Sequence, residues 1–584
     1  MTGNIYTFDA TNVTLKRKSF EFANLTASEQ AYFSNKCSGS PSLPQCGPFA
    51  AARITTADSG TNFVNYLRGQ RGNELSVDLS TGVYRARDYI LGDTVNSKPI
   101  FVGAPSFNFA DAVTPDYPTF KAAQASRQRV LYISSNDGML HAFNGDTGAE
   151  MWAWVPKMIM PNLWKLASNS YDINHTYFVD GTPDVMDVYM GGSWKTILVS
   201  GLNAGGRGYY AIDITDPTSP KGLWEICSDA TLCAISDSDM GYSFGVPIIT
   251  KRFDGTPIVI LTSGYNNVTP GNGGGYLYVL NAATGAVIEK IGTTISGTNV
   301  GNTTTPSGFT KVSGYAVNGS QNNTVEYVYG GDLLGNVWRF DMRSSPTVVQ
   351  RLATLKDAST PARPQSVTTR PEITHLDTGY TIVYVGTGRF LGSSDLGDPS
   401  LLTPPEPYAW QQSIYAIKDT GTDLGNLRLP AANMVQQTMS LISATNRTIT
   451  NYPVDLATNN GWYVDFNPAN ASPGERVNLD PALIRGTLVV ITNEPNTQAC
   501  SAGGNGYAYF FNYVTGSYIA GQPNNTVGVQ VSSALAVGAV FYRGTTGAIF
   551  SQIRSADGRN IFSAPPSLAS GANGRRVSWR ELVQ

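Results

Sequence analysis

The sequence predicts an all-β protein built as a β-propeller. Three observations lead to this prediction: one short phrase recurs six times, each copy has the alternation of a strand, and a turn with a second apolar run follows most copies. Of the 584 residues, 60 are Gly and 11% are aromatic. Strands favour aromatic and β-branched residues and turns favour Gly and Asn, so the composition also indicates an all-β fold.

The repeated phrase begins with Gly or Ser, continues as alternating aromatic and apolar residues, and ends in Asn, Asp or Lys. Alternation at a period of two indicates a half-buried strand, and the turn that follows predicts a hairpin. The copies lie roughly 60–95 residues apart, which leaves room for four strands and long, irregular insertions in each repeat. They occupy residues 138–152, 208–224, 275–288, 335–349, 413–425 and 506–519.

Seven blades are predicted from these repeats. Residues 3–12 match the same phrase and can serve as a seventh copy, because a propeller often closes by combining strands from both ends of the chain. We therefore expect residues 1–125 to form an N-terminal strand and insertion region that closes the propeller, and residues 126–584 to form the blades. Six or eight blades, and an open sandwich of hairpins, stay open as alternatives.

The charge pattern excludes several classes of function. The net charge is −3 and only 14% of the residues are charged, so there is no basic excess for nucleic acid and no polybasic run for an anionic membrane. No continuous apolar run reaches the about 18–20 residues that span a bilayer. The first residues lack the pattern of a signal peptide and start inside what reads as a strand, so we expect further sequence upstream.

Five cysteines divide into two close pairs and one single residue. Cys37 and Cys46 enclose one short, turn-rich span, and Cys227 and Cys233 enclose another. This spacing predicts two local disulfides and an oxidising compartment, whereas a zinc site needs tighter pairs and usually His. Cys500 is left without a predicted partner.

The repeated phrase resembles the blade repeat of quinoprotein dehydrogenases. In that repeat a Tyr-Ala-hydrophobic-Asp strand is followed by Thr-Gly and a closing Trp. Trp152 and Trp224 fill the closing position here. The resemblance implies that both side chains are structural and pack between adjacent blades.

Longer motifs resemble the C-terminal β-propeller region of the PilC/PilY family, the type IV pilus tip adhesins and biogenesis factors. They agree with the family in order and spacing over nearly the whole chain. The motifs lie at residues 65–74, 84–103, 136–156, 177–188, 193–217, 241–249, 263–288, 327–342, 384–392 and 574–582.

The resemblance implies a secreted protein at the pilus tip or outer cell surface of a Gram-negative bacterium. Such a protein supports pilus assembly, counters retraction and takes part in adhesion, acting by binding. The implied partners are minor pilins at the pilus tip, a host or abiotic surface ligand, and an N-terminal region of the same protein. A carbohydrate-binding or other surface-ligand-binding propeller unrelated to pili is one alternative.

A secreted quinoprotein-type dehydrogenase is the alternative from a different class. Those enzymes stack their cofactor against a disulfide of adjacent cysteines, and this chain has no adjacent cysteines. It has three His, at 141, 175 and 375, none in a metal-ligand spacing. His141 alternates with apolar neighbours and is predicted to be a packed core residue. Since the propeller fold alone implies no chemistry, we predict that the protein is not an enzyme.

One polar loop is the candidate metal site. Polar residues recur at every second position at Asn318, Ser320, Asn322, Thr324 and Glu326. In the PilC/PilY family a calcium-binding loop with Asp at such positions precedes the motif at 327–342, so the resemblance implies these five ligands, with Thr324 contributing its backbone carbonyl. Only Glu326 is charged, and calcium affinity rises with ligand charge. A weak calcium site and an ordinary polar turn are both open.

Three further acidic motifs are predicted to be structural. Asn136-Asp137-Gly138 has the chemistry of a tight hairpin turn. Asp180, Asp184 and Asp187 are expected in a turn and on a solvated face. Asp237 and Asp239 could contact a cation, but two carboxylates alone rarely form a site.

Overall fold

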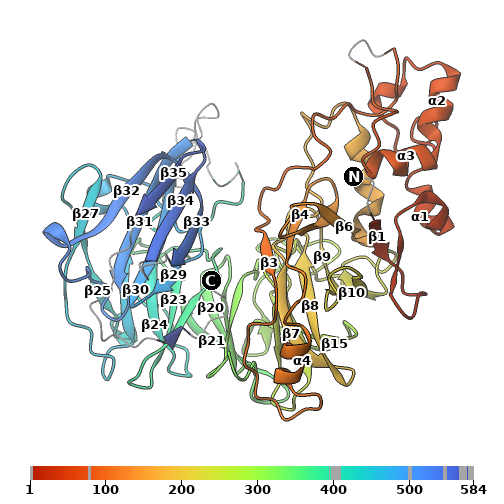
Figure 1. Cartoon of the computed structure of the whole chain (residues 1–584). Coiled ribbons are helices and arrows are strands. Elements are labelled where there is room, and N and C mark those ends of the chain that lie inside the picture. The colour runs from red at the N-terminus through yellow and green to blue at the C-terminus, as the bar shows by residue number, and fades with distance from the viewer. Residues whose placement is uncertain are drawn as a thin grey trace. The chain divides into compact units, whose positions relative to one another are not determined.

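The computed structural model describes residues 4–76, 80–392, 395, 410–496, 503–543, 549–563 and 575–576. The chain divides into two compact units whose elements are labelled in Figure 1. The first unit contains Met1–Lys290, Asn302–Pro306 and Ser320–Thr324. The second contains Ile291–Gly301, Ser307–Gly319 and Val325–Gln584.

Three sheets form the framework of the first unit, with strand orders β2-β1-β6-β5-β4-β3, β11-β10-β9-β8-β7 and β12-β13-β14-β15. The strands of the first sheet are β1 (Asn4–Phe8), β2 (Arg17–Ser19), β3 (Ile100–Val102), β4 (Val130–Ser135), β5 (Met139–Asn144) and β6 (Glu150–Val155). Those of the second are β7 (Asp184–Met190), β8 (Ser193–Gly201), β9 (Gly208–Asp213), β10 (Lys221–Cys227) and β11 (Ile235–Ser236). Those of the third are β12 (Ile248–Lys251), β13 (Pro257–Thr262), β14 (Tyr276–Asn281) and β15 (Val287–Gly292).

Four short α-helices belong to the first unit. Three of them gather on one side of it (Figure 1): α1 (Ala27–Ala31), α2 (Ala51–Asp58) and α3 (Gly60–Leu67). The fourth, α4 (Tyr117–Ala123), precedes β4, and the 3-10 helices η1 (Phe22–Asn24), η2 (Pro44–Cys46) and η3 (Lys157–Ala167) complete the set. Thr26 starts α1 with a capping box to Glu29, which satisfies two backbone N–H groups that a helix start leaves unpaired. No helix in the described ranges combines the length and the hydropathy needed to cross a bilayer.

Four sheets and a ribbon of β16 (Thr294–Ile295) and β17 (Thr298–Asn299) form the second unit. One sheet contains β18 (Val312–Tyr315), β19 (Tyr327–Gly331), β20 (Asn336–Asp341) and β21 (Val348–Thr354). The next contains β22 (Glu372–His375), β23 (Thr381–Gly386), β24 (Ser413–Lys418), β25 (Val435–Gln437), β28 (Gly461–Asp465) and β36 (Arg575–Arg576).

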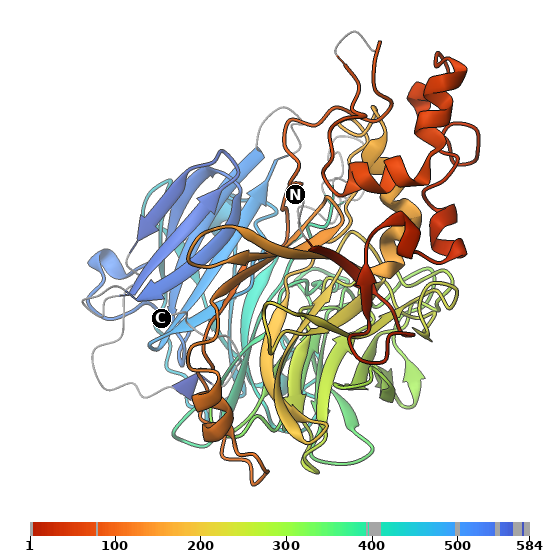
Figure 2. The same ribbon diagram turned by 45° about the vertical axis from the view of Figure 1, so that its right-hand side comes forward.

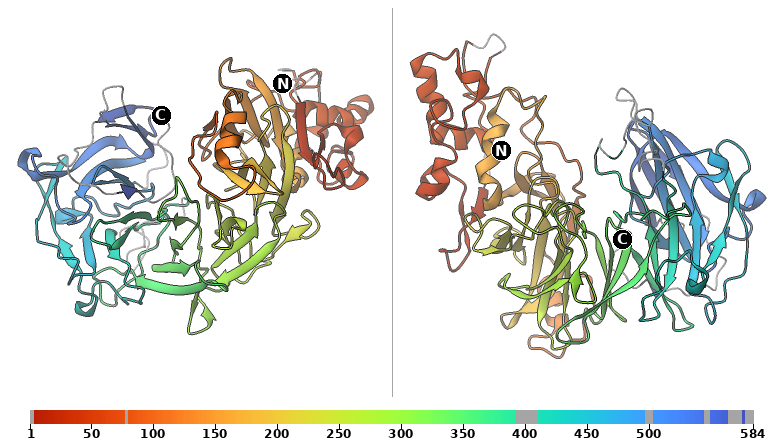
Figure 3. Two further views of the ribbon diagram at one scale, coloured as in Figure 1. Left: turned by 60° about the horizontal axis from the view of Figure 1, so that its bottom comes forward. Right: turned by 180° about the vertical axis from the view of Figure 1, so that it is seen from behind.

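The last two sheets of the second unit lie side by side (Figure 3). The larger contains β26 (Met439–Leu441), β27 (Asn446–Ile449), β29 (Ala482–Ile484), β30 (Thr487–Pro495), β31 (Gly503–Asn512) and β32 (Thr526–Ala534). The smaller contains β33 (Ala536–Arg543), β34 (Ile549–Ser555) and β35 (Asn560–Ser563). Three 3-10 helices lie in the connections: η6 (Pro430–Ala432), η7 (Pro468–Asn470) and η8 (Pro523–Asn525).

The six copies of the repeated phrase occupy equivalent places in six sheets. Without its extra edge strands, each of these sheets has four strands in succession. Each copy supplies the third of the four in chain order: β5, β9, β14, β20, β24 and β31. The apolar run that follows becomes the fourth strand, which in one sheet comes only after a long insertion, at β28. The all-β fold and the repeat interpretation are therefore confirmed.

The phrase at residues 3–12 behaves differently from the other six. Its strand β1 does not begin a sheet of its own but pairs in parallel with β6, as Figure 2 shows. The described C-terminal strand, β36, pairs with β22 in the second unit. The seventh sheet instead comes from β33, β34 and β35, which carry no copy of the phrase. The blade number and the division at residue 125 stay predictions.

A tryptophan links neighbouring sheets at the same position of several repeats. Trp152 of β6 is 1% exposed and its indole N–H donates a 2.7 Å hydrogen bond to the Pro217 carbonyl, in the β9–β10 turn of the next sheet. Trp224 of β10 donates a 2.9 Å bond to the Ala282 carbonyl beyond β14. In the second unit, Trp462 donates in the same way to Tyr513. The predicted packing of Trp152 and Trp224 between sheets is confirmed.

Candidate functional site

Part of the predicted calcium loop lies in the first unit. Ser320 and Asn322 are exposed, and the Asn322 side-chain oxygen accepts a 2.6 Å hydrogen bond from the Thr324 hydroxyl. The Ser320 carbonyl accepts a 3.1 Å bond from a backbone N–H of the segment before α4. Asn323 is buried and fastens the loop to β12, since its carbonyl accepts from the Lys251 N–H at 3.0 Å. The loop is thus held in place by the backbone carbonyls of Ser320 and Asn323, and Asn323 is not one of its predicted ligands.

The other two predicted ligands lie in the second unit. Asn318 is exposed and Glu326 is half-buried. The Glu326 backbone N–H donates a 2.8 Å hydrogen bond to Tyr315, and its carbonyl accepts one of 2.8 Å from Met342. Calcium binding through Asn318 and Glu326 together with the other three residues stays a prediction.

Both predicted disulfides are present. Cys37 and Cys46 are bonded across the turn between α1 and α2, with a Cα–Cα distance of 5.4 Å. Cys227 and Cys233 are bonded beyond β10, with a Cα–Cα distance of 5.8 Å. Cys500 lies outside the described residues. The two bonds close short loops at the surface of the first unit and fit an oxidising compartment.

Asp237 and Asp239 do face a cation, and it is supplied by the chain. The Lys290 ammonium lies 2.8 Å from an Asp237 oxygen and 2.7 Å from an Asp239 oxygen. Burial alone would lower the pKa of Lys290, but the hydrogen bonds and charges of the two carboxylates raise it above its ordinary value. The ammonium occupies the position between the carboxylates that a bound metal ion would need.

The expectation of a solvated face for the acidic motif at 180–187 is wrong for two of its residues. Asp180 is 1% exposed, and its carboxylate accepts bonds from the backbone and side-chain N–H groups of Asn96. Asp187 is 5% exposed and accepts from the hydroxyls of Tyr117 and Thr196 at 2.7 and 2.5 Å. Both carboxylates can be buried because distant segments supply donors, which the local sequence did not reveal.

His141 is buried as predicted, and it is also the centre of an ionic cluster. Its Nδ1 lies 2.6 Å from a Glu150 oxygen and its Nε2 lies 3.1 Å from both oxygens of Asp137. Asp137 starts the predicted tight turn, in which Gly138 has a φ of 93°. Burial alone would lower the pKa of His141, but the charges and hydrogen bonds of Asp137 and Glu150 raise it to about 9. The imidazolium therefore pairs with two carboxylates and fastens β5 to its neighbours.

This cluster predicts a loss of stability at alkaline pH. The ordinary pKa of His is 6.5, so a pKa of about 9 in the folded state stabilises the fold fully below pH 6.5. That contribution should disappear as the pH rises through about 9, at a cost of up to about 3 kcal/mol. Urea unfolding followed by circular dichroism across this pH range measures it. His141→Gln keeps side-chain donors but cannot titrate, so the same alkaline loss in both proteins would contradict the assignment.

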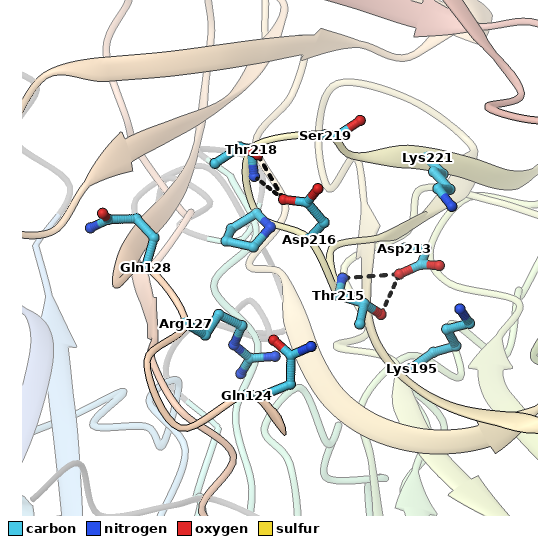
Figure 4. A pocket seen from close by; sticks show the side chains of 11 residues that line it. Gln124, Arg127, Gln128, Lys195, Asp213, Thr215, Asp216, Thr218, Ser219 and Lys221 are labelled. Atoms are coloured by element: carbon cyan, nitrogen blue, oxygen red, sulfur yellow. Dashed lines mark hydrogen bonds between the residues drawn. The ribbon is translucent and has the colours of Figure 1, made fainter. Parts of the chain in front are cut away.

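A polar pocket of about 380 Å³ lies in the first unit. The segment before β4 forms one wall, and strands β8, β9 and β10 with the β9–β10 turn form the others (Figure 4). We call it the lysine pocket, and its lining residues are Gln124, Arg127, Gln128, Lys195, Asp213, Thr215, Asp216, Pro217, Thr218, Ser219 and Lys221.

The sheet register places the charged groups of the lysine pocket together. Lys221 on β10 pairs with Asp213 on β9, and Asp213 pairs with Ile197 on β8. Lys195 lies two residues before Ile197, and residues two apart share a face of a strand. Figure 4 accordingly shows Asp213 between the two lysines. Lys195, Lys221 and Arg127 thus line the same pocket as the carboxylates of Asp213 and Asp216.

Each carboxylate of the lysine pocket is held by its own turn. One oxygen of Asp213 accepts bonds of 2.9 and 2.5 Å from the backbone N–H and hydroxyl of Thr215. One oxygen of Asp216 accepts bonds of 3.0 and 2.7 Å from the same groups of Thr218. Sequence reasoning missed this pocket. The repeated Asp-x-Thr spacing in DITDPT was its one local signal, since such spacing favours side-chain-to-backbone turns.

Comparison with known proteins finds a matching family model and several relatives of this chain. A family model described as the PilY1 beta-propeller domain matches residues 91–450. A type IV pilus biogenesis factor PilY1 homolog of Xylella fastidiosa is 32% identical over 611 residues, which cover 100% of this chain and 46% of that protein. Type IV pilus biogenesis factor PilY1 of Pseudomonas aeruginosa strain PAK is 32% identical over 80% of this chain and 41% of its own length. The chain thus spans less than half the length of these relatives.

A solved structure supports the same assignment. The crystal structure of the Pseudomonas aeruginosa PilY1 C-terminal domain aligns with a TM-score of 0.60 and 26% sequence identity. The alignment covers 80% of this chain and 100% of the other. The likeness therefore extends over most of the sheets described above.

Proposed function

Because the chain belongs to the PilY1 beta-propeller family, we propose that it is the propeller portion of a type IV pilus biogenesis factor. The observation that carries this proposal is the match of the family model over residues 91–450, together with relatives of that name along the whole chain. The proposed activity is to support pilus assembly, to counter retraction and to contribute to surface adhesion.

The proposed mode of action is binding and not catalysis. The proposed partners are minor pilins at the pilus tip, a host or abiotic surface ligand, and the rest of a longer protein. The chain lacks the adjacent cysteines against which quinoprotein dehydrogenases stack their cofactor, which argues against the enzyme alternative. The proposed location is the pilus tip or outer cell surface, and the two disulfides support an oxidising environment outside the cytoplasm.

Deletion of the gene, in a strain with active retraction and in one with retraction disabled, tests this function. We expect surface pili to be lost in the first strain and restored at least in part in the second, because a factor that counters retraction is dispensable when retraction is absent. Complementation with the full gene controls for effects on neighbouring genes. Normal piliation and twitching in the deletion strain, or turnover of alcohols with added pyrroloquinoline quinone, would contradict the proposal.

The proposal for the loop at 318–326 is a weak calcium site. Asn318, Ser320, Asn322 and Thr324 supply neutral oxygens and Glu326 supplies the single carboxylate. To bind calcium, the side-chain oxygen of Asn322 would also have to lose the 2.6 Å hydrogen bond that it accepts from the Thr324 hydroxyl. Extracellular calcium modules bind with dissociation constants of about 10⁻⁴–10⁻³ M, and this donor set belongs at or beyond the weak end of that range.

Restoring charge to the loop should strengthen calcium binding. Replacing Asn318, Ser320 and Asn322 together by Asp should tighten binding by about tenfold or more, which corresponds to about 1.4 kcal/mol. Glu326→Ala should abolish the binding of the parent. Calorimetry with CaCl₂ on the three proteins measures both effects. Micromolar binding by the parent would contradict the charge argument, and an unchanged triple-Asp variant would identify the loop as an ordinary polar turn.

A further inference from the structure

We propose that the lysine pocket binds an acidic saccharide, a sugar unit that carries a carboxylate. The inference extends the proposed surface adhesion to a ligand class and a site. Its test is separate from the pilus test, because binding is measured on the purified chain whereas piliation is measured on cells.

The two lysines provide the groups that recognise the carboxylate. Lys195 and Lys221 are half-buried, and within the described residues neither ammonium has a hydrogen-bond or ion-pair partner. Asp213 lies between them without approaching within ion-pair distance of either. Each ammonium has three N–H donors, so the pair can donate charge-assisted hydrogen bonds to the oxygens of an incoming carboxylate.

Arg127 serves a different purpose from the lysines. Its guanidinium donates to the carbonyl of Gly103 and to the hydroxyl of Thr196, and that hydroxyl donates to the buried Asp187 at 2.5 Å. The charge of Arg127 is therefore balanced behind the wall of the pocket. The free ammonium groups, and not the arginine, determine the preference for an anion.

The remaining polar groups suit a ligand that carries hydroxyls. Asp213 and Asp216 each use one carboxylate oxygen in their own turn, which leaves the second oxygen to accept from a sugar hydroxyl. The amide of Gln124 has no partner within the described residues and can both donate and accept. An acidic peptide side chain has no hydroxyls to satisfy these acceptors, so the mixture of cations and acceptors favours a sugar.

The shape and chemistry of the lining exclude an apolar ligand. Pro217 is the single apolar residue among those that line the pocket, and no aromatic side chain contributes to it. The volume of about 380 Å³ lies at the lower end of the about 300–1,000 Å³ typical of small-ligand sites. A sugar unit with one or two neighbours is the size of ligand that such a pocket encloses.

Saturation-transfer NMR titration of the full chain with glucuronate, glucose and acetate tests the inference. Glucose keeps the ring and hydroxyls but lacks the carboxylate, and acetate has the carboxylate alone. We expect saturable binding of glucuronate, and binding of the other two that is weaker by about tenfold or more, because each loses charge-assisted or hydroxyl hydrogen bonds. Added salt should weaken glucuronate binding.

Matched variants identify the site. Lys195→Met with Lys221→Met should weaken glucuronate binding by about tenfold or more. Lys195→Arg with Lys221→Arg keeps both charges and should keep most of the binding. Comparison of the two double variants therefore distinguishes the loss of the charges from a general loss of folding. Lys165→Met removes another half-buried lysine of the same unit, outside the pocket, and should change nothing. Equal affinity for glucose or acetate, or unchanged binding by the double Met variant, would overturn the proposal.

Discussion

Replacement of Trp224 by alanine should lower the free energy of unfolding by about 3–5 kcal/mol, the usual cost of removing a fully buried tryptophan. Trp224 is 1% exposed and fills the space between two sheets of the first unit. Its indole N–H also donates to the Ala282 carbonyl at 2.9 Å. A cavity at this place would remove both packing and a hydrogen bond, and urea unfolding followed by circular dichroism measures the loss.

Two further substitutions separate the contributions at this position. Trp224→Phe keeps an aromatic six-membered ring but leaves the Ala282 carbonyl without its donor, which should cost about 1–3 kcal/mol. Gly285 has a φ of 72°, and a Cβ at this residue would lie 2.5 Å from the Trp224 ring. Gly285→Ala should therefore also be destabilising. A loss below about 1 kcal/mol for Trp224→Ala would contradict the role in joining the sheets.

Replacement of Arg447 by methionine should destabilise the second unit by about 3–5 kcal/mol, because it leaves a buried carboxylate without its counter-ion. Arg447 and Glu475 are 2.7 Å apart, and their side chains are 2% and 0% exposed. Glu475 also accepts 2.6 Å hydrogen bonds from Thr492 and Tyr509. Arg447 lies 4.0 Å from the centre of the Tyr507 ring. The pair thus connects β27, β30 and β31.

A double variant and a surface control test the explanation. Arg447→Met combined with Glu475→Leu removes both charges and should cost less than Arg447→Met alone, since no unpaired carboxylate remains. Arg343 forms a 2.7 Å ion pair with Asp341 but its side chain is 48% exposed. Arg343→Met should cost no more than about 1 kcal/mol. Similar losses for Arg343→Met and Arg447→Met, by thermal unfolding, would show that burial is not the cause.

Features with a short-range physical cause could be predicted from the sequence. The alternation within each repeated phrase follows from the period of a strand, so six third strands were located without the structure. The two disulfides join cysteines that are nine and six residues apart, which a single turn brings together. The positions of Trp152 and Trp224 followed from the repeat, because equivalent residues of successive repeats have equivalent neighbours.

Features that depend on long-range partners were decided by the tertiary structure. The phrase at 3–12 resembles the others, yet β1 pairs in parallel with β6, because so short a stretch of local sequence cannot specify which sheet edge is free. Asp180 and Asp187 are buried because Asn96 and Tyr117, far away in the chain, supply their hydrogen bonds. The lysine pocket likewise combines the segment before β4 with β8–β10. The free energy of burying a charge depends on where its partners lie in space, and local sequence does not encode that position.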